Sequence, residues 1–375
     1  MRNTRKATVT DRFLDFITQS EAMVSIVVVL LGFLVGTILV ILVGRNPSGM
    51  YSAITQVLTG WDLRRGTWNA RYIGEWLVMS LPLILCGLSV AFAGRTGLFN
   101  IGAEGQYVAG LTAAQFVAIF GPQIPFLHWI LAILAALVVG ALWGGIVGIL
   151  KAKYSVSEVV ATIMLNYVAY FTSRVLTMMI PGANTYRTPT YPQTARLASP
   201  FLEQLTNGSR LNYGLYLALI SILFFWIVIG KTRLGFSLRA TGLNKEAARY
   251  AGINVNASIT TAMAISGAFA GLAGAVVALG SFNYGRVLGG LDGYGFDGIA
   301  VALVGNSTAW GTALSGLLFG MLKSAQPLMQ SRQIPKEITA IIMGLVVVFI
   351  SLRAGVRMLM EWRMKEQAKK GRVIE

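Results

Sequence analysis

The sequence predicts an all-α polytopic membrane protein of about ten transmembrane helices. Hydrophobic residues make up 55% of the 375 residues, and charged residues only 12%. Several segments also reach the roughly 20 apolar residues that a helix needs to cross a bilayer. Between two of these segments, residues 97–106 combine glycines with an amide and a carboxylate. Polar backbone breaks in membrane proteins usually line a cavity, although a tight glycine turn would produce the same pattern.

The predicted spans follow one another along nearly the whole chain. In order, they cover residues 24–44, 76–94, 106–121, 127–150, 158–179, 211–230, 257–280, 296–304, 312–329 and 337–352. The third is weakly apolar and the eighth is too short to cross alone, which favours discontinuous helices at both places. The chain is therefore divided into an N-terminal segment (1–23), a transmembrane domain (24–355) and a basic C-terminal tail (356–375).

The basic residues predict that both termini are cytoplasmic. An even number of spans places both termini on one side, and the segments on that side would hold most of the 31 Lys and Arg residues. The first 23 residues contain no small-residue cleavage site, which indicates an uncleaved anchor. Residues 45–75 are an exception, because they would place four arginines outside; an interfacial helix there would explain this.

Small residues recur at helical spacing in three of the spans. Gly140, Gly144 and Gly148 form one series, and the pairs 267/271 and 316/320 form two more. This spacing leaves one face of each helix bare, so we expect close helix packing there. A short internal similarity, between residues 99–102 and 296–299, precedes two spans of opposite direction and is consistent with an inverted repeat.

Composition and motifs exclude several function classes. The net charge of +16 would suggest nucleic acid as a partner of a soluble protein, but no nucleic-acid-binding module is visible. Cys86 is the only cysteine and can form no internal disulfide. We identify no catalytic residues and no metal ligands. Because no glycine-rich phosphate loop is present, we do not expect the chain to be an enzyme that hydrolyses ATP.

The loop at residues 231–256 is long, charged and contains a short helical pattern that ends at a glycine. Leu243, Ala247 and Tyr250 are apolar residues at helical spacing, so this segment can dock in a groove of a soluble partner. An ordinary basic loop on the cytoplasmic side would also account for its charge.

Two motifs resemble the permease subunits of bacterial ATP-binding cassette importers of the ribose, branched-chain amino acid and nucleoside group. They lie at residues 100–106 (Asn-Ile-Gly-Ala-Glu-Gly-Gln) and 242–253. Residues 156–167 and 296–305 are similar to the nucleoside branch of this group. The resemblance extends from about residue 81 to residue 355 and leaves out the N-terminal region.

The resemblance implies a type II permease fold, like that of vitamin B12 importers, in the bacterial plasma membrane. It implies a nucleoside substrate and a substrate-binding lipoprotein on the outer side of the membrane. It also implies a second, non-identical permease that lies beside this chain among the membrane lipids. ATP and Mg would be used by a separate ATPase subunit, and this chain would bind no cofactor itself. The position of a coupling helix that rests on the ATPase corresponds to seven residues: Gly242, Leu243, Glu246, Ala247, Ala248, Tyr250 and Gly252.

The substrate pathway is predicted from chemistry as well as from the resemblance. A nucleoside presents hydroxyls, base-edge donors and acceptors, and a flat ring, so it calls for amides, carboxylates and aromatic side chains. Six residues are candidates: Asn100, Glu104, Gln106, Asn166, Tyr167 and Asp297. Glu104 and Asp297 have an alternative role as helix caps or as ion-pair partners of Arg174 or Lys323. The amide and the ring at 166 and 167 have an alternative role in bonding a neighbouring helix.

Other functions remain open from the sequence. A simple sugar such as ribose is an alternative cargo, and purine and pyrimidine nucleosides are not distinguished. A secondary transporter would use Glu104 and Asp297 to carry protons or sodium, but the loop at 231–256 argues against it. No filter-like repeat supports a channel.

Overall fold

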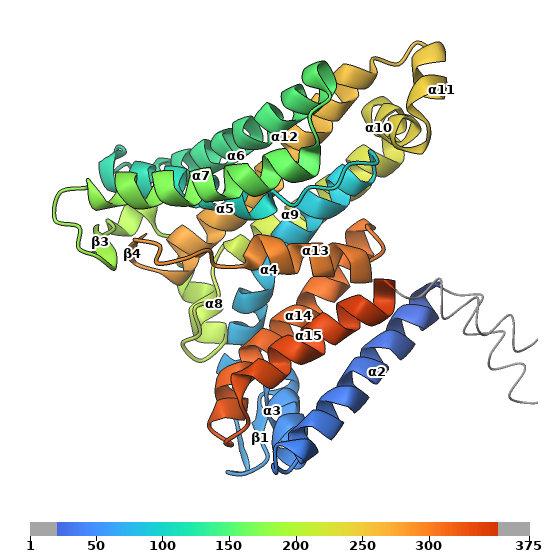
Figure 1. Ribbon diagram of the computed structural model, residues 1–375. Helices are drawn as coiled ribbons and strands as arrows, with labels where there is room; N and C mark the ends of the chain where they lie inside the picture. Colours follow the sequence, from blue (N-terminus) through green and yellow to red (C-terminus); the bar gives the residue numbers. More distant parts are fainter. Residues whose placement is uncertain (1–20, 352–375) are drawn as a thin grey trace, which may run out of the picture. The chain divides into compact units, whose positions relative to one another are not determined.

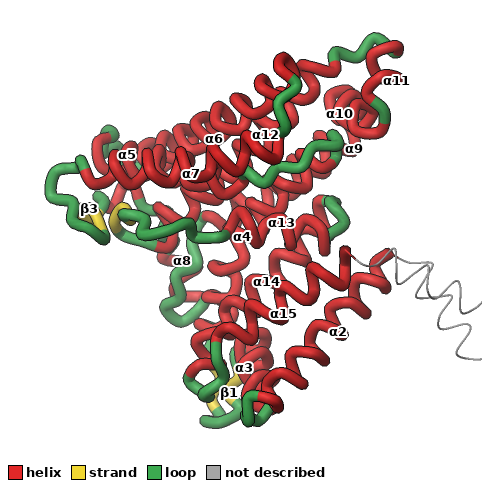
Figure 2. Tube along the Cα trace, viewed as in Figure 1, coloured by secondary structure: helices red, strands yellow, loops and turns green. Residues whose placement is uncertain are grey.

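The computed structural model describes residues 21–351 (Figure 1). Most of the predicted N-terminal segment (1–23) and all of the tail (356–375) therefore lie outside the described residues. The described residues form two compact units, one from residues 21–49 together with 330–351, and the other from residues 50–329. The described residues are predominantly helical, with four short strands confined to loops (Figure 2). The prediction of an all-α protein is confirmed.

A helix is found at every predicted span. In order these helices are α2 (Glu21–Leu42), α4 (Arg71–Gly94), α5 (Ala103–Phe120), α6 (Leu127–Tyr154), α7 (Glu158–Met178), α9 (Gly214–Lys231), α12 (Val255–Val276), α13 (Tyr294–Val304), α14 (Ala309–Gln330) and α15 (Lys336–Ser351). Within residues 21–351, five helices are long and apolar enough to cross a membrane: α4, α6, α7, α9, and α12 with its π-helical extension Val277–Ser281. The chain is thus a multi-pass membrane protein.

Shorter elements occupy the connections. They are α3 (Ser48–Thr59), β1 (Trp61–Asp62), β2 (Thr67–Trp68), β3 (Arg187–Thr190), the 3₁₀ turn Gln193–Ala195, α8 (Pro200–Leu205), α10 (Arg233–Leu243), α11 (Lys245–Tyr250) and β4 (Tyr284–Arg286). The two strand pairs are antiparallel: β1 with β2, and β3 with β4. Helix α3 lies within residues 45–75, and its position at the membrane interface stays a prediction.

The first unit contains α2 and α15, which lie side by side (Figure 1). Gly32 faces Val346, and Gly36 faces Ile342, so the two helices run antiparallel. A Cβ added at Gly36 would lie 2.4 Å from the Ile342 side chain. The loops at the end of this pair are joined by Arg45, which donates to the Gln333 side-chain oxygen at 2.7 Å.

Helix α12 is the centre of the second unit, where it packs against α4, α5 and α6. A Cβ at Gly267 of α12 would lie 2.1 Å from the Gly140 carbonyl oxygen of α6, so the two backbones touch. The predicted glycine faces of α6 and α12 therefore pack on each other. The third glycine series packs elsewhere, because Gly316 of α14 faces Ile84 of α4.

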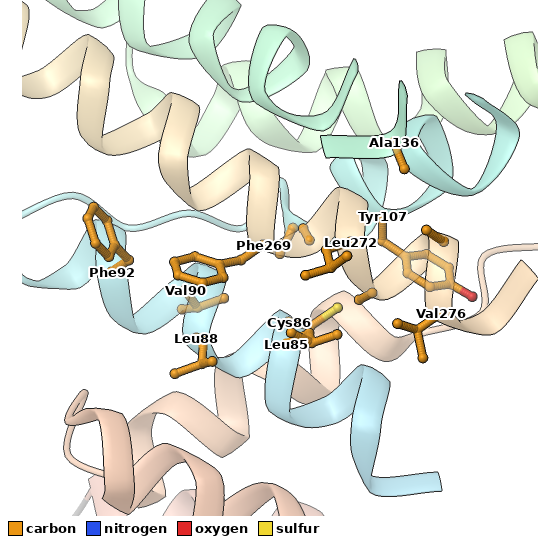
Figure 3. Packing of buried hydrophobic residues seen from close by; sticks show 14 of the residues in the cluster. Leu85, Cys86, Leu88, Val90, Phe92, Tyr107, Ala136, Phe269, Leu272 and Val276 are labelled. Carbon is orange, nitrogen blue, oxygen red and sulfur yellow. The ribbon is translucent and has the colours of Figure 1, made fainter. Parts of the chain in front are cut away.

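Apolar side chains fill the space between α4, α5 and α12 (Figure 3). Phe92 and Phe269 lie with their ring centroids 5.9 Å apart, and Leu85, Leu272 and Cys86 are buried beside them. The thiol is a packing residue of this core. This core supports the polar segment at the start of α5.

Candidate functional site

The segment before α5 returns from the end of α4 to the middle of α12. Asn100 lies in this non-helical segment, and its Nδ2 donates to Gln106 Oε1 at 2.8 Å and to Ser266 Oγ at 2.7 Å. Its Oδ1 accepts from the Gly102 backbone N–H at 2.9 Å, which forms a turn that leads into α5. Ser266 is near the midpoint of α12, so α5 begins at mid-helix depth. The predicted backbone break is therefore present, and its polar groups are satisfied by the protein.

Helix α7 closes the other side of this break. Asn166 Oδ1 accepts from the Gly105 backbone N–H at 2.8 Å, and its Nδ2 donates to the Ile101 carbonyl at 3.1 Å. Asn100, Gln106 and Asn166 are at most 1% exposed. These amides hold the first turn of α5 between α7 and α12. The contacts of Asn166 thus match the alternative role given above, in which this amide bonds a neighbouring helix.

Glu104 joins the starts of two helices. Its Oε1 accepts from the Gly293 backbone N–H at 2.7 Å, and its Oε2 accepts from the Gly295 backbone N–H at 2.6 Å. These N–H groups open α13, so a buried side chain of α5 serves as the cap of another helix. A Cβ at Gly295 would lie 2.1 Å from the Glu104 backbone nitrogen, so only glycine fits this approach.

Helix α13 also begins alongside the middle of a long helix, because Gly298 packs against Cys86 of α4. Its N-cap residue is Gly293, which has a φ of 82°. Asp297 does not cap this helix; it forms an ion pair with Lys323 of α14. The side chains of Asp297 and Lys323 are 29% and 19% exposed. Of the alternatives that the sequence left open, Glu104 thus acts as a cap and Asp297 as an ion-pair partner.

A second ion pair lies on the segment that leads into α13. Arg286 donates to both oxygens of Asp292, at 2.6 and 2.7 Å, and Tyr107 donates to Asp292 Oδ2 at 2.8 Å. Sequence reasoning missed these three residues. Two opposite charges between apolar segments, at 286 and 292, were the available signal, but nothing in the sequence indicates that they pair.

The structure brings most of the predicted pathway residues together. The side chains of Asn100, Glu104, Gln106 and Asn166 meet at the start of α5, and Asp297 lies in the first turn of α13, which Glu104 caps. Tyr167 differs, because its side chain lies on α7 and is 53% exposed. No group of three or more metal-binding side chains occurs within residues 21–351.

The predicted docking segment consists of two helices rather than one. Asn244 separates α10 from α11, because its side chain accepts from the Ala247 backbone N–H at 3.0 Å and so caps a new helix. Leu243 and Tyr250 therefore lie on different helices, and they are 88% and 93% exposed. Glu246 forms an exposed ion pair with Arg249 at 3.1 Å.

The remaining residues of this segment are placed differently. Ala247 and Gly252 are exposed, whereas Ala248 is buried against the rest of the chain. Gly252 has a φ of 80°, which is the glycine helix end that the sequence predicted. Gly242 packs against the turn that follows α4, where a Cβ would lie 2.7 Å from the Arg95 carbonyl oxygen.

Arg95 connects this turn to another hairpin. Its Nε donates to the Ser307 carbonyl at 2.7 Å, in the turn between α13 and α14. Asn306 and Ser307 both have positive φ values, 51° and 48°, so this turn is tightly bent. The end of α10, the end of α4 and the α13–α14 turn are therefore in contact through one arginine and one glycine.

The comparisons with known proteins agree on one family. The family described as "Branched-chain amino acid transport system / permease component" matches residues 72–351. The chain is 41% identical over 344 residues to the guanosine ABC transporter permease protein NupP of Bacillus subtilis (strain 168), covering 91% of this chain and 96% of that protein. It is 36% identical over 341 residues to the nucleoside ABC transporter permease protein NupB of Lactococcus lactis subsp. cremoris (strain MG1363), covering 89% and 91%.

A relative with a different cargo is also similar. The chain is 35% identical over 289 residues to a glucose ABC transporter permease protein of Haloferax volcanii, covering 74% of this chain and 75% of that protein. The two bacteria named above each have a second relative of the same type, NupC of Lactococcus lactis at 27% identity and NupQ of Bacillus subtilis at 28%.

Proposed function

Because the chain belongs to the family of branched-chain amino acid transport system permease components, we propose that it is a membrane subunit of an ATP-driven importer and forms part of a nucleoside pathway. The observation that carries this proposal is the 41% identity to a guanosine permease across 96% of that protein. A second nucleoside permease, at 36% identity over 91% of its length, supports the same cargo. A simple sugar remains the second candidate substrate, because one similar protein is named a glucose permease.

The arrangement of the helices supports a transport pathway. Helices α5 and α13 both begin beside the middle of longer helices, and their starts meet at Glu104. Discontinuous helices of this kind surround the substrate sites of many transporters. We propose that all ten helices cross or enter the membrane in a type II arrangement, with both termini cytoplasmic and the α5 and α13 segments related as an inverted repeat.

The buried contacts of Glu104 weaken the ion-coupled alternative. Both of its oxygens are occupied by backbone donors, and the side chain is 0% exposed. A proton or sodium carrier must exchange its ion with water during each cycle. Glu104 is therefore assigned to holding the two helix starts, together with Asn100, Gln106 and Asn166, whereas exposed Tyr167 and partly exposed Asp297 are kept as the residues that face the substrate.

The importer needs partners that this chain does not supply. An ATP-binding cassette ATPase would use ATP and Mg, and a substrate-binding lipoprotein would deliver the nucleoside from outside. A second, non-identical permease would complete the pathway. The relatives support such a pair, because each of the two bacteria has one permease at 36–41% identity and another at 27–28%.

We place the ATPase contact on α10 and α11. Leu243 and Tyr250 present exposed apolar surface on the loop between α9 and α12, and no partner inside residues 21–351 covers them. Gly242 and Arg95 connect this surface to the α13–α14 turn. Movement of α10 would thus be transmitted to the helix that carries Asp297, which is the requirement for coupling ATP hydrolysis to alternating access.

Uptake by the assembled transporter tests the proposal. The complete system is expressed in cells that lack other nucleoside importers, and uptake of labelled guanosine, uridine and ribose is measured. Nucleoside uptake should disappear when the phosphate-binding lysine of the ATPase is replaced. Uptake of ribose alone would favour a sugar as the substrate. Uptake that persists without this lysine but requires the proton gradient would refute an ATP-driven importer.

A further inference from the structure

Two ion pairs lie on either side of the start of α13, and neither is sealed. The side chains of Arg286 and Asp292 are 25% and 13% exposed, and those of Lys323 and Asp297 are 19% and 29% exposed. Glu104, in the same region, is 0% exposed. The start of α13 therefore contacts one fully enclosed carboxylate and lies beside two partly exposed ion pairs.

Aromatic rings make the two pairs continuous. Tyr107 donates to Asp292, and its ring centroid lies 5.6 Å from that of Tyr294. Lys323 Nζ lies 4.7 Å from the centroid of the Tyr294 ring, in a cation–π arrangement. We call this group the charged row; its four charged side chains and Tyr294 are partly exposed, whereas Tyr107 is 0% exposed and supports Asp292 from the interior. It consists of Arg286, Asp292, Tyr107, Tyr294, Lys323 and Asp297.

The charged row cannot face lipid. Ionised side chains are costly in hydrocarbon, and such residues in membrane proteins normally face a bundle interior or a water-filled cavity. Pairing reduces this cost but does not remove it while part of each group stays exposed. The exposed side of the charged row is therefore the side of this chain that meets an aqueous space.

We propose that the charged row is the surface that contacts the permeating substrate, and that it selects uncharged nucleosides over nucleotides. This inference rests on the proposed function. Its carboxylates can accept from ribose hydroxyls, and its guanidinium and ammonium groups can donate to base edges. Each cation is already neutralised, Arg286 by a two-point contact with Asp292, so the row offers no unpaired cation to a phosphate.

Cysteine labelling of the complete transporter tests the position of the row. Gln326 lies three residues after Lys323 on α14 and so shares its face. Leu314 lies about two and a half turns before Lys323, on the opposite face, and is 68% exposed. The native thiol at Cys86 is buried and gives little background. The variants Gln326→Cys and Leu314→Cys are treated with a charged, water-soluble methanethiosulfonate in membranes.

The row predicts a clear difference between these variants. Gln326→Cys should react at least several-fold faster than Leu314→Cys, and guanosine, but not guanosine monophosphate, should slow its reaction. Equal labelling of both cysteines would overturn the aqueous face. Labelling of Gln326→Cys that guanosine does not slow, in a complex with normal guanosine uptake, would overturn substrate contact and leave the proposed function intact.

A charge variant tests the selection against phosphate. Asp292→Asn keeps an oxygen for Tyr107 but leaves Arg286 without its counter-ion. Guanosine monophosphate should then inhibit guanosine uptake about tenfold more strongly than in the unmodified complex, because an unpaired guanidinium attracts phosphate. Unchanged inhibition would overturn the selectivity. If the unmodified complex takes up no nucleoside, the proposed function fails, and the labelling still decides whether the row faces water.

Discussion

Removal of the Glu104 side chain should destabilise the junction between α5 and α13. Its two oxygens are acceptors for the backbone N–H groups of Gly293 and Gly295, and the side chain is 0% exposed. Glu104→Ala leaves both donors without an acceptor. Glu104→Gln keeps the shape and one acceptor oxygen, but it turns an amide NH₂ toward the second donor and removes the negative charge at the start of α13.

The size of the effect follows from the number of donors. A buried donor without an acceptor costs about 1–3 kcal/mol, so Glu104→Ala should lower the free energy of unfolding by about 2–6 kcal/mol through its two donors, and Glu104→Gln, which retains one bond, by about 1–3 kcal/mol. Both variants also lose the negative charge at the helix N-terminus, which adds up to about 2 kcal/mol to each loss. The order of stability should be unmodified, then Gln, then Ala.

The midpoint of thermal aggregation, measured on the permease in lipid nanodiscs, ranks these variants. Glu203→Gln is the matched control, because Glu203 is an exposed carboxylate in the first turn of α8. A surface change of this kind should stay within about 0.5 kcal/mol of the unmodified chain. If Glu104→Ala had the same thermal midpoint as Glu203→Gln and the unmodified chain, Glu104 would not hold the two helix starts together.

Three further predictions concern packing and coupling. Gly267→Ala should destabilise the α6–α12 contact by about 1–3 kcal/mol, because its Cβ would meet the backbone of α6. Gly145→Ala is the control and should be tolerated, because its Cβ would lie 3.8 Å from Ala264. The thermal midpoints of the two variants measure this difference. Arg95→Gln should lower nucleoside uptake per ATP hydrolysed several-fold at an unchanged midpoint, and a normal ratio would refute the role of Arg95 in coupling. Tyr250→Ala should reduce copurification of the ATPase, while Arg249→Ala, which removes only an exposed ion pair, should retain it.

Local sequence patterns were sufficient for the helices. Each predicted span coincides with a helix, because long apolar runs and glycine spacing act within one segment. The break at residues 97–106 was also visible, since glycines and amides in an apolar context have few other uses. The split of the docking segment at Asn244 was missed, because an Asn between two short helical runs caps the second run only if the backbone turns there.

The partners of the polar residues were beyond sequence reasoning. Asn100 bonds Ser266, and Glu104 bonds the backbone at Gly293, across separations of 166 and 189 residues. A helix pattern cannot indicate such contacts, because they depend on how whole helices cross. The charged row could not be predicted from the sequence for the same reason. In it, α5, α13, α14 and the loop before α13 each supply only one or two groups.

The sequence by itself therefore determined the class of protein, the positions of its predicted spans and the backbone break, since all of these depend on residues that are neighbours along the chain. Only the tertiary structure decided that Glu104 is enclosed as a cap while Asp297 remains partly exposed beside Lys323. Both are carboxylates near a helix start, and the sequence treats them alike. They differ because burial and pairing depend on the groups that folding brings to each one.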